Sequence, residues 1–179
     1  MIAAKPTPLI LICYKIGMSY YIQIERVPYE EPYHLELHWT ISSGEISSKF
    51  EIYDNASVLS DFVNALNDFP KHSEDKFVYQ IGGEEVESKW AYFFRLIFST
   101  NPRGHDATID VKFLNHQTSQ DTRIVDFRLH TNSPNLRKLA KLFSKFSKLK
   151  SQILYWDNSD AFVGSIAEFR SLDWKSADA

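Results

Sequence analysis

The residues best suited to chemistry are three metal-capable side chains at alternate positions, His34, Glu36 and His38. In a helix, two histidines four residues apart lie on one face and form a zinc pair. Here the intervening positions are large and apolar, a pattern typical of a half-buried strand: Leu35, Leu37, Trp39 and Ile41. A strand separates His34 from His38 by about 13 Å, too far for both to bind one ion. We therefore interpret the trio as a solvated polar face, on which adjacent members could chelate only with a ligand from elsewhere, and we expect no metal or other cofactor.

A second candidate lies in the loop residues Arg103-Gly104-His105. Glycine permits close approach of a ligand, and histidine titrates near neutral pH. Arg103 and His105 are therefore a candidate ligand site, although a turn in which His105 satisfies backbone groups explains the same residues. No serine, cysteine or carboxylate at a suitable spacing completes a catalytic set. The chain also lacks a phosphate-binding glycine loop, a dinucleotide fingerprint and a nucleophile elbow, so we expect a protein that is not an enzyme.

Acidic side chains are concentrated in the first half of the chain. Residues 1–99 carry 14 acidic and 8 basic side chains, whereas residues 100–179 carry 9 acidic and 12 basic ones. An acidic loop and an acidic helix face supply candidate residues for binding a basic protein partner: Glu84, Glu85, Glu87, Asp61 and Asp68. Ordinary solvated charges are the competing interpretation.

The remaining charges favour no nucleic-acid partner. The net charge is −3, and no aromatic platform accompanies the basic stripe expected on the second helix: Arg137, Lys138, Lys141, Lys145 and Lys148. Cys13 is the only cysteine, so neither an intramolecular disulfide nor a cysteine-based zinc site can form. The apolar run at residues 8–13 is too short to span a membrane. We expect a cytoplasmic protein with no membrane partner.

The apolar patterns predict an α+β fold of antiparallel hairpins with two amphipathic helices packed on one side. The first helix is expected from a cap at Asp54 or Asn55 to about Phe69, and the second begins after a cap at Ser133. Strands are expected over residues 20–27, 34–42, 46–53, 76–81, 89–99, 108–115, 122–130 and 153–156. Residues 161–169 fit a short helix or a strand. The four tryptophans are expected mainly as core anchors: Trp39, Trp90, Trp156 and Trp174.

A shift of 77 residues superimposes the apolar and capping positions of one strand and helix on another. It carries Phe50 onto Phe127, Asn55 onto Asn132 and Leu66 onto Phe143. We therefore expect an internal repeat of strand, strand, helix and strand in a single domain over residues 18–157, with halves at 18–81 and 88–157. Residues 1–17 are expected as an extension or extra strand, and residues 158–179 as a partly ordered segment.

The order of these elements resembles the WapI-type family of bacterial immunity-protein-like domains. The resemblance covers roughly residues 20–149 and is carried by Leu66-Asn67-Asp68-Phe69-Pro70, Arg103-Gly104-His105, Thr108-Ile109-Asp110-Val111 and the second helix from Leu136 to Phe143. It implies a small cytosolic protein that binds and neutralises a cognate toxin domain. The first hypothesis is thus a non-enzymatic protein that binds one protein partner.

Two alternatives stay open at the level of sequence. The protein could be a small-ligand-binding or catalytic domain that uses His105 together with His34 and His38. It could instead be a structural homo-oligomer, because similar halves and hairpin edges favour self-association.

Overall fold

The computed structural model describes residues 20–28, 30–85, 89–103, 105–116 and 123–172. It confirms an α+β fold with two antiparallel sheets and three helices among these residues. Glu87, Trp174 and the extension at residues 1–17 lie outside the described part of the chain. No described helix combines the length and apolar character needed to cross a membrane.

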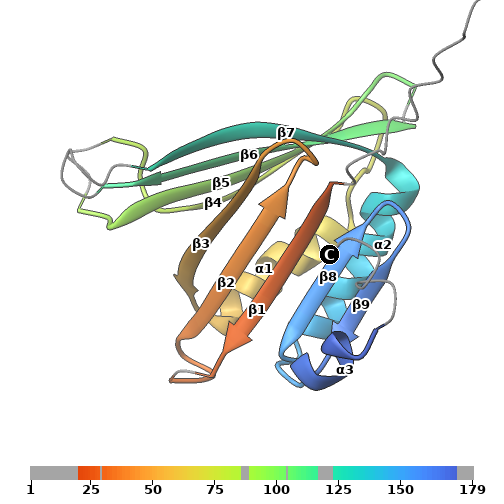
Figure 1. Ribbon diagram of the computed structural model, residues 1–179. Coiled ribbons are helices and arrows are strands. Elements are labelled where there is room, and N and C mark those ends of the chain that lie inside the picture. Colours follow the sequence, from red (N-terminus) through yellow and green to blue (C-terminus); the bar gives the residue numbers. More distant parts are fainter. Residues whose placement is uncertain (1–19, 29, 86–88, 104, 117–122, 173–179) are drawn as a thin grey trace, which may run out of the picture.

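Sheet A has five strands in the order β3-β2-β1-β8-β9, and sheet B has four in the order β4-β5-β6-β7 (Figure 1). The strands of sheet A are β1 (Tyr21–Val27), β2 (Leu35–Ser42), β3 (Ser47–Asp54), β8 (Ile153–Asp157) and β9 (Ala161–Gly164). Those of sheet B are β4 (Lys76–Ile81), β5 (Tyr92–Thr100), β6 (Asp106–Asn115) and β7 (Ile124–Asn132). The helices are α1 (Ala56–Asn67), α2 (Ser133–Phe146) and α3 (Ile166–Arg170).

The two halves each run through three strands, a helix and a return strand, and each return strand joins the sheet of the other half. β4 follows α1 but pairs with β5 in sheet B, whereas β8 follows α2 but pairs with β1 in sheet A. Each half therefore contains three strands before its helix, one more than the expected unit of two strands, a helix and a strand. The exchange of β4 and β8 ties each half to the other.

Matching asparagines begin the two long helices. The Asn55 side chain accepts from the backbone N–H of Val58, and the Asn132 side chain accepts from that of Asn135. Such caps satisfy N–H groups that the first helical turn leaves unpaired. The expectation of a Ser133 cap is wrong, because Ser133 is already helical and buried and its N–H donates to the carbonyl of His105.

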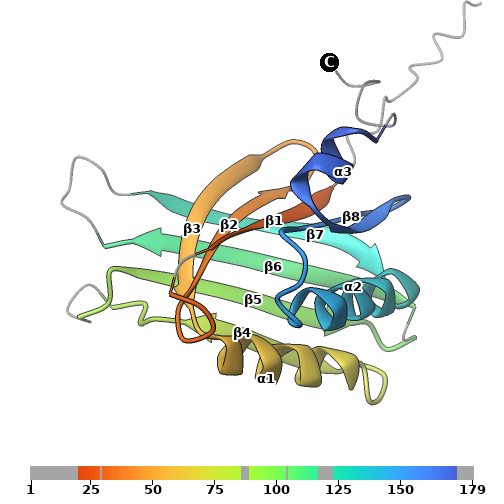
Figure 2. The same cartoon turned by 90° about the horizontal axis from the view of Figure 1, so that it is seen from below.

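One hydrophobic core joins both sheets to α1 and α2. The Trp39 ring of sheet A lies 5.2 Å from the Phe94 ring of sheet B and 6.1 Å from the Phe143 ring of α2. The helices also contact each other, since Asn67 Nδ2 of α1 donates to Ser144 Oγ of α2 at 2.9 Å. Figure 2 shows the two helices side by side along sheet B.

The segment after β8 forms a strand, β9, which joins sheet A, and a helix, α3, which packs on the sheet. β9 extends the sheet, and α3 lies on the side of the sheet away from α1 and α2 (Figure 2). Phe169 of α3 packs on Tyr155 of β8, with ring centroids 5.6 Å apart. The outer face of sheet A is thus covered over β8, and its part formed by β1, β2 and β3 carries polar side chains.

The tryptophans divide between the core and the surface. Trp39 and Trp156 are fully buried, as expected, but Trp90 is 58% exposed. Trp90 precedes β5, which begins only at Tyr92 and not at residue 89. The core position expected for Trp90 is therefore wrong.

Candidate functional site

A pocket of about 600 Å³ lies beside β3. One side is formed by β2 and β3, including His38, Lys49, Glu51 and Tyr53. The other side comes from the end of sheet B that projects past β3 in Figure 1, and contributes Ala91, Tyr92, Phe113, Asn115 and Arg123. The pocket thus lies where an edge strand of one sheet meets the end of the other.

Every second residue of β3 points its backbone N–H and C=O groups toward this pocket. The Ser43 N–H donates to the Ile46 carbonyl across the turn that joins β2 and β3, which sets the hydrogen-bonding phase of the hairpin. Because hydrogen-bonded and non-hydrogen-bonded pairs alternate in antiparallel strands, Ser48, Phe50 and Ile52 bond to β2. The backbone groups of Lys49, Glu51 and Tyr53 therefore point away from β2. Among the described residues, no further strand pairs with the backbone N–H and C=O groups of Lys49 and Glu51.

Tyr92 closes one end of this edge. Its hydroxyl oxygen accepts from the Tyr53 N–H and donates to the Tyr53 carbonyl, both at 2.8 Å. Burial raises the pKa of Tyr92, so its hydroxyl keeps the proton that it donates. The free edge of β3 consequently begins beyond Tyr53, at Glu51.

Stacked aromatic rings fix the position of sheet B against β3. Phe50 and Phe113 stack with ring centroids 4.8 Å apart, and the Tyr92 ring also stacks on Phe113, at 6.1 Å. Both phenylalanines are buried. The wall of the pocket is therefore anchored in the core rather than held by loops alone.

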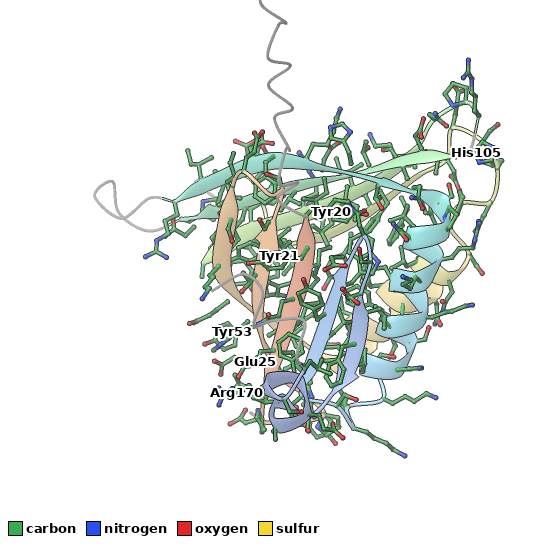
Figure 3. The ribbon with its side chains drawn as sticks, turned by 45° about the vertical axis from the view of Figure 1, so that its right-hand side comes forward. Tyr20, Tyr21, Glu25, Tyr53, His105 and Arg170 are labelled. Atoms are coloured by element: carbon green, nitrogen blue, oxygen red, sulfur yellow. The ribbon has the colours of Figure 1, made fainter. Side chains whose placement is uncertain are left out.

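The candidate ligand residues Arg103 and His105 lie far from this pocket. Both are exposed, and the carbonyl of His105 accepts from Ser133 at the start of α2. Figure 3 places His105 at the opposite end of the molecule from Tyr53 and from Glu25, the β1 residue paired with His38. The structure does not bring His105 together with the polar face of β2, as the ligand-binding alternative requires.

The candidate acidic residues do not form one surface. Glu84 lies over the outer face of sheet B, where Lys112 and Arg95 both contact its carboxylate. The Lys112 hydrogen bond is the main cause that holds the Glu84 pKa below its usual value. Asp61 is exposed on α1, which packs on the opposite face of sheet B, and Asp68 is exposed directly after this helix. Glu85 is exposed beside Glu84. The charge of Glu84 is compensated within the chain.

Sequence analysis missed Lys49, Glu51, Tyr53 and Tyr92 as site residues. The Ser43-Gly44 turn that predicts the hairpin also sets its register, so Glu51 could have been placed opposite His38. No sequence signal reports the contact between Tyr92 and Tyr53, which depends on how the two sheets pack.

Comparison with known proteins adds no relative: no family model, curated protein or solved structure matches this chain.

Proposed function

We propose that the protein is a non-catalytic binding protein that engages one protein partner through the free edge of β3. The observation that carries this proposal is the row of backbone groups at Lys49 and Glu51, which faces a pocket of about 600 Å³. An exposed strand edge is a template for an added strand, and proteins use such edges to bind extended peptides.

The spacing of the available groups favours a peptide over a small ligand. Groups that face the pocket recur at every second residue of β3, which is the repeat of an extended chain. Side chains around them could then select the partner's sequence: Lys49, Glu51, Tyr53 and Arg123 all line the pocket. A small-molecule site would instead offer a few convergent polar groups in an enclosing cavity.

A cognate bacterial toxin domain is the partner class that we propose. The resemblance in element order to immunity-protein-like domains supports it. The surplus of acidic side chains in the first half, 14 against 8 basic ones, favours attraction of a basic partner. The net charge of −3 gives no support to nucleic-acid binding.

The test compares two variants of the same residue, Lys49→Pro and Lys49→Ala. Proline removes the outward N–H but leaves the bonds of Ser48 and Phe50 to β2, and edge strands tolerate it for that reason. Alanine removes the charge and keeps the N–H. The tagged full-length chain and both variants are used to capture proteins from a lysate of the producing cells, with mass spectrometry and light scattering of the complex.

We expect one stoichiometric protein partner for the parent chain and for Lys49→Ala, and at least a tenfold loss of its affinity for Lys49→Pro. Far-UV circular dichroism checks that Lys49→Pro is folded. Equal capture by folded Lys49→Pro would contradict the β3 interface. Capture of no partner would contradict the binding function, and a complex containing only copies of this chain would assign the edge to self-association.

A further inference from the structure

Three metal-capable side chains meet on the outer face of sheet A. Glu36 and His38 occupy alternate positions of β2 and so project from the same face. Glu51 is directly opposite His38 on β3, in a non-hydrogen-bonded pair, where side chains of neighbouring strands lie closest. The hairpin register thus supplies the third ligand that the spacing of the β2 residues alone does not.

The distances suit one small ion between the three side chains. Nε2 of His38 lies 2.7 Å from Oε1 of Glu36 and 4.0 Å from Oε1 of Glu51. All three ligand atoms lie within 4.8 Å of one another. Tetrahedral bonds of about 2.0–2.1 Å place neighbouring ligand atoms about 3.3 Å apart, a value between the two observed distances from His38. Small side-chain rotations would therefore bring all three atoms to bonding distance.

The carboxylates next to His38 favour a cation, while Lys49 and Arg123 lie farther along the pocket lining. Neither carboxylate forms an ion pair with a lysine or arginine among the described residues; His38 is the partner found for both. Glu25, paired with His38 from the β1 side, adds another carboxylate to this face. Glu36 is also largely shielded, with a side chain only 18% exposed.

We propose that Glu36, His38 and Glu51 form a binding site for a divalent transition metal, with Zn²⁺ as the best-matched ion. One imidazole nitrogen and two carboxylate oxygens are ordinary zinc ligands, whereas Ca²⁺ requires six to eight oxygens. Three protein ligands leave at least one coordination position open. His38 and Glu51 line the pocket beside β3, so that position would face the pocket. This site is independent of the proposed partner, because the free chain contains all three ligands.

Metal titration of the free chain tests the site. The full-length protein is treated with a chelator, and Zn²⁺ binding is measured by calorimetry. Co²⁺ is then used as a probe, because its visible absorption reports coordination number and geometry. We expect one Zn²⁺ per chain and a four- or five-coordinate Co²⁺ spectrum. His38→Ala should weaken binding at least 100-fold, and Glu51→Gln at least 10-fold.

His34→Ala is the matched control. His34 precedes β2 at the same alternation as His38, and its side chain is 62% exposed. This variant should bind Zn²⁺ as the parent does. Absence of Zn²⁺ binding, or equal binding by folded His38→Ala, would overturn the site. Equal weakening by His34→Ala and His38→Ala would show nonspecific histidine binding and would also overturn it.

Discussion

At the scale of single residues, the pair formed by Asp54 and Tyr79 links the end of β3 in sheet A to β4 in sheet B. The Tyr79 hydroxyl donates to Oδ2 of Asp54 at 2.7 Å. Burial raises the pKa of Asp54, while the hydrogen bonds from Tyr79 and from the Asn55 N–H act in the opposite direction. Burial, reinforced by the negative charge of Asp54, raises the Tyr79 pKa well above 10, so the phenol stays a donor throughout the neutral range.

Replacement of Tyr79 by phenylalanine should give a pH-dependent loss of stability. Because the folded-state pKa of Asp54 is raised, the stability linked to it is complete below the unfolded pKa and falls as pH rises through the folded value. Without the Tyr79 donor that pKa rises further and the ionised carboxylate loses a partner. We expect a loss of about 1–3 kcal/mol at pH 7 and a smaller loss at pH 3.

Urea unfolding at the two pH values measures this difference. Tyr33→Phe is the control, because Tyr33 is 77% exposed and its replacement should change the free energy of unfolding little at either pH. An equal loss at pH 3 and pH 7 for Tyr79→Phe would mean that the pair acts through packing alone.

At the scale of elements, the caps of α1 and α2 are equivalent devices in the two halves. Asn55→Ala and Asn132→Ala should each lower the free energy of unfolding by about 1 kcal/mol, because each removes the acceptor for one helical N–H. Asn55→Ser and Asn132→Ser should recover most of the loss, since serine also caps. Thermal or urea unfolding of the four variants checks this, and a loss in the serine variants equal to that in the alanine variants would contradict a capping role.

Local patterns in the sequence predict most elements of this fold. Alternating apolar residues give the strands of the β2–β3 hairpin, and the stripe with Leu59, Phe62 and Leu66 gives the buried face of α1. The second cap was misplaced by one residue because Asn132 and Ser133 are both good capping residues. Which of the two residues caps α2 depends on where the extended backbone of β7 ends. The backbone stays extended through Asn132, so Asn132 is the cap.

The assembly of the elements was harder to predict than the elements themselves. The periodicity of apolar residues does not reveal that β4 and β8 each join the sheet of the other half, because an apolar strand can pair with an edge strand of either sheet. Likewise, the acidic loop gives no sign that Lys112, 28 residues from Glu84, compensates its charge. The candidate site at β3 depends on a further long-range contact, the packing of Tyr92 and Phe113 of sheet B against β3, and for that reason only its hairpin register was accessible from the sequence.

At the scale of the whole molecule, the exchange of β4 and β8 predicts that the halves depend on each other. A fragment of residues 20–81 lacks the β8 that covers β1, and a fragment of residues 89–172 lacks the β4 that covers β5. We expect each fragment alone to be largely unfolded by circular dichroism. We also expect the full chain to unfold in one transition, with coincident curves from circular dichroism and tryptophan fluorescence. A stably folded fragment, or two separated transitions, would contradict this dependence.

Amide hydrogen exchange along β3 tests the proposed interface most directly. In the free chain, the N–H groups of Lys49 and Glu51 should exchange quickly, whereas those of Phe50 and Ile52, bonded to β2, should be protected. In the complex with the captured partner, Lys49 and Glu51 should become protected by at least tenfold. Unchanged exchange at these two residues in the complex, with new protection on α1 or around Glu84, would contradict binding at the β3 edge.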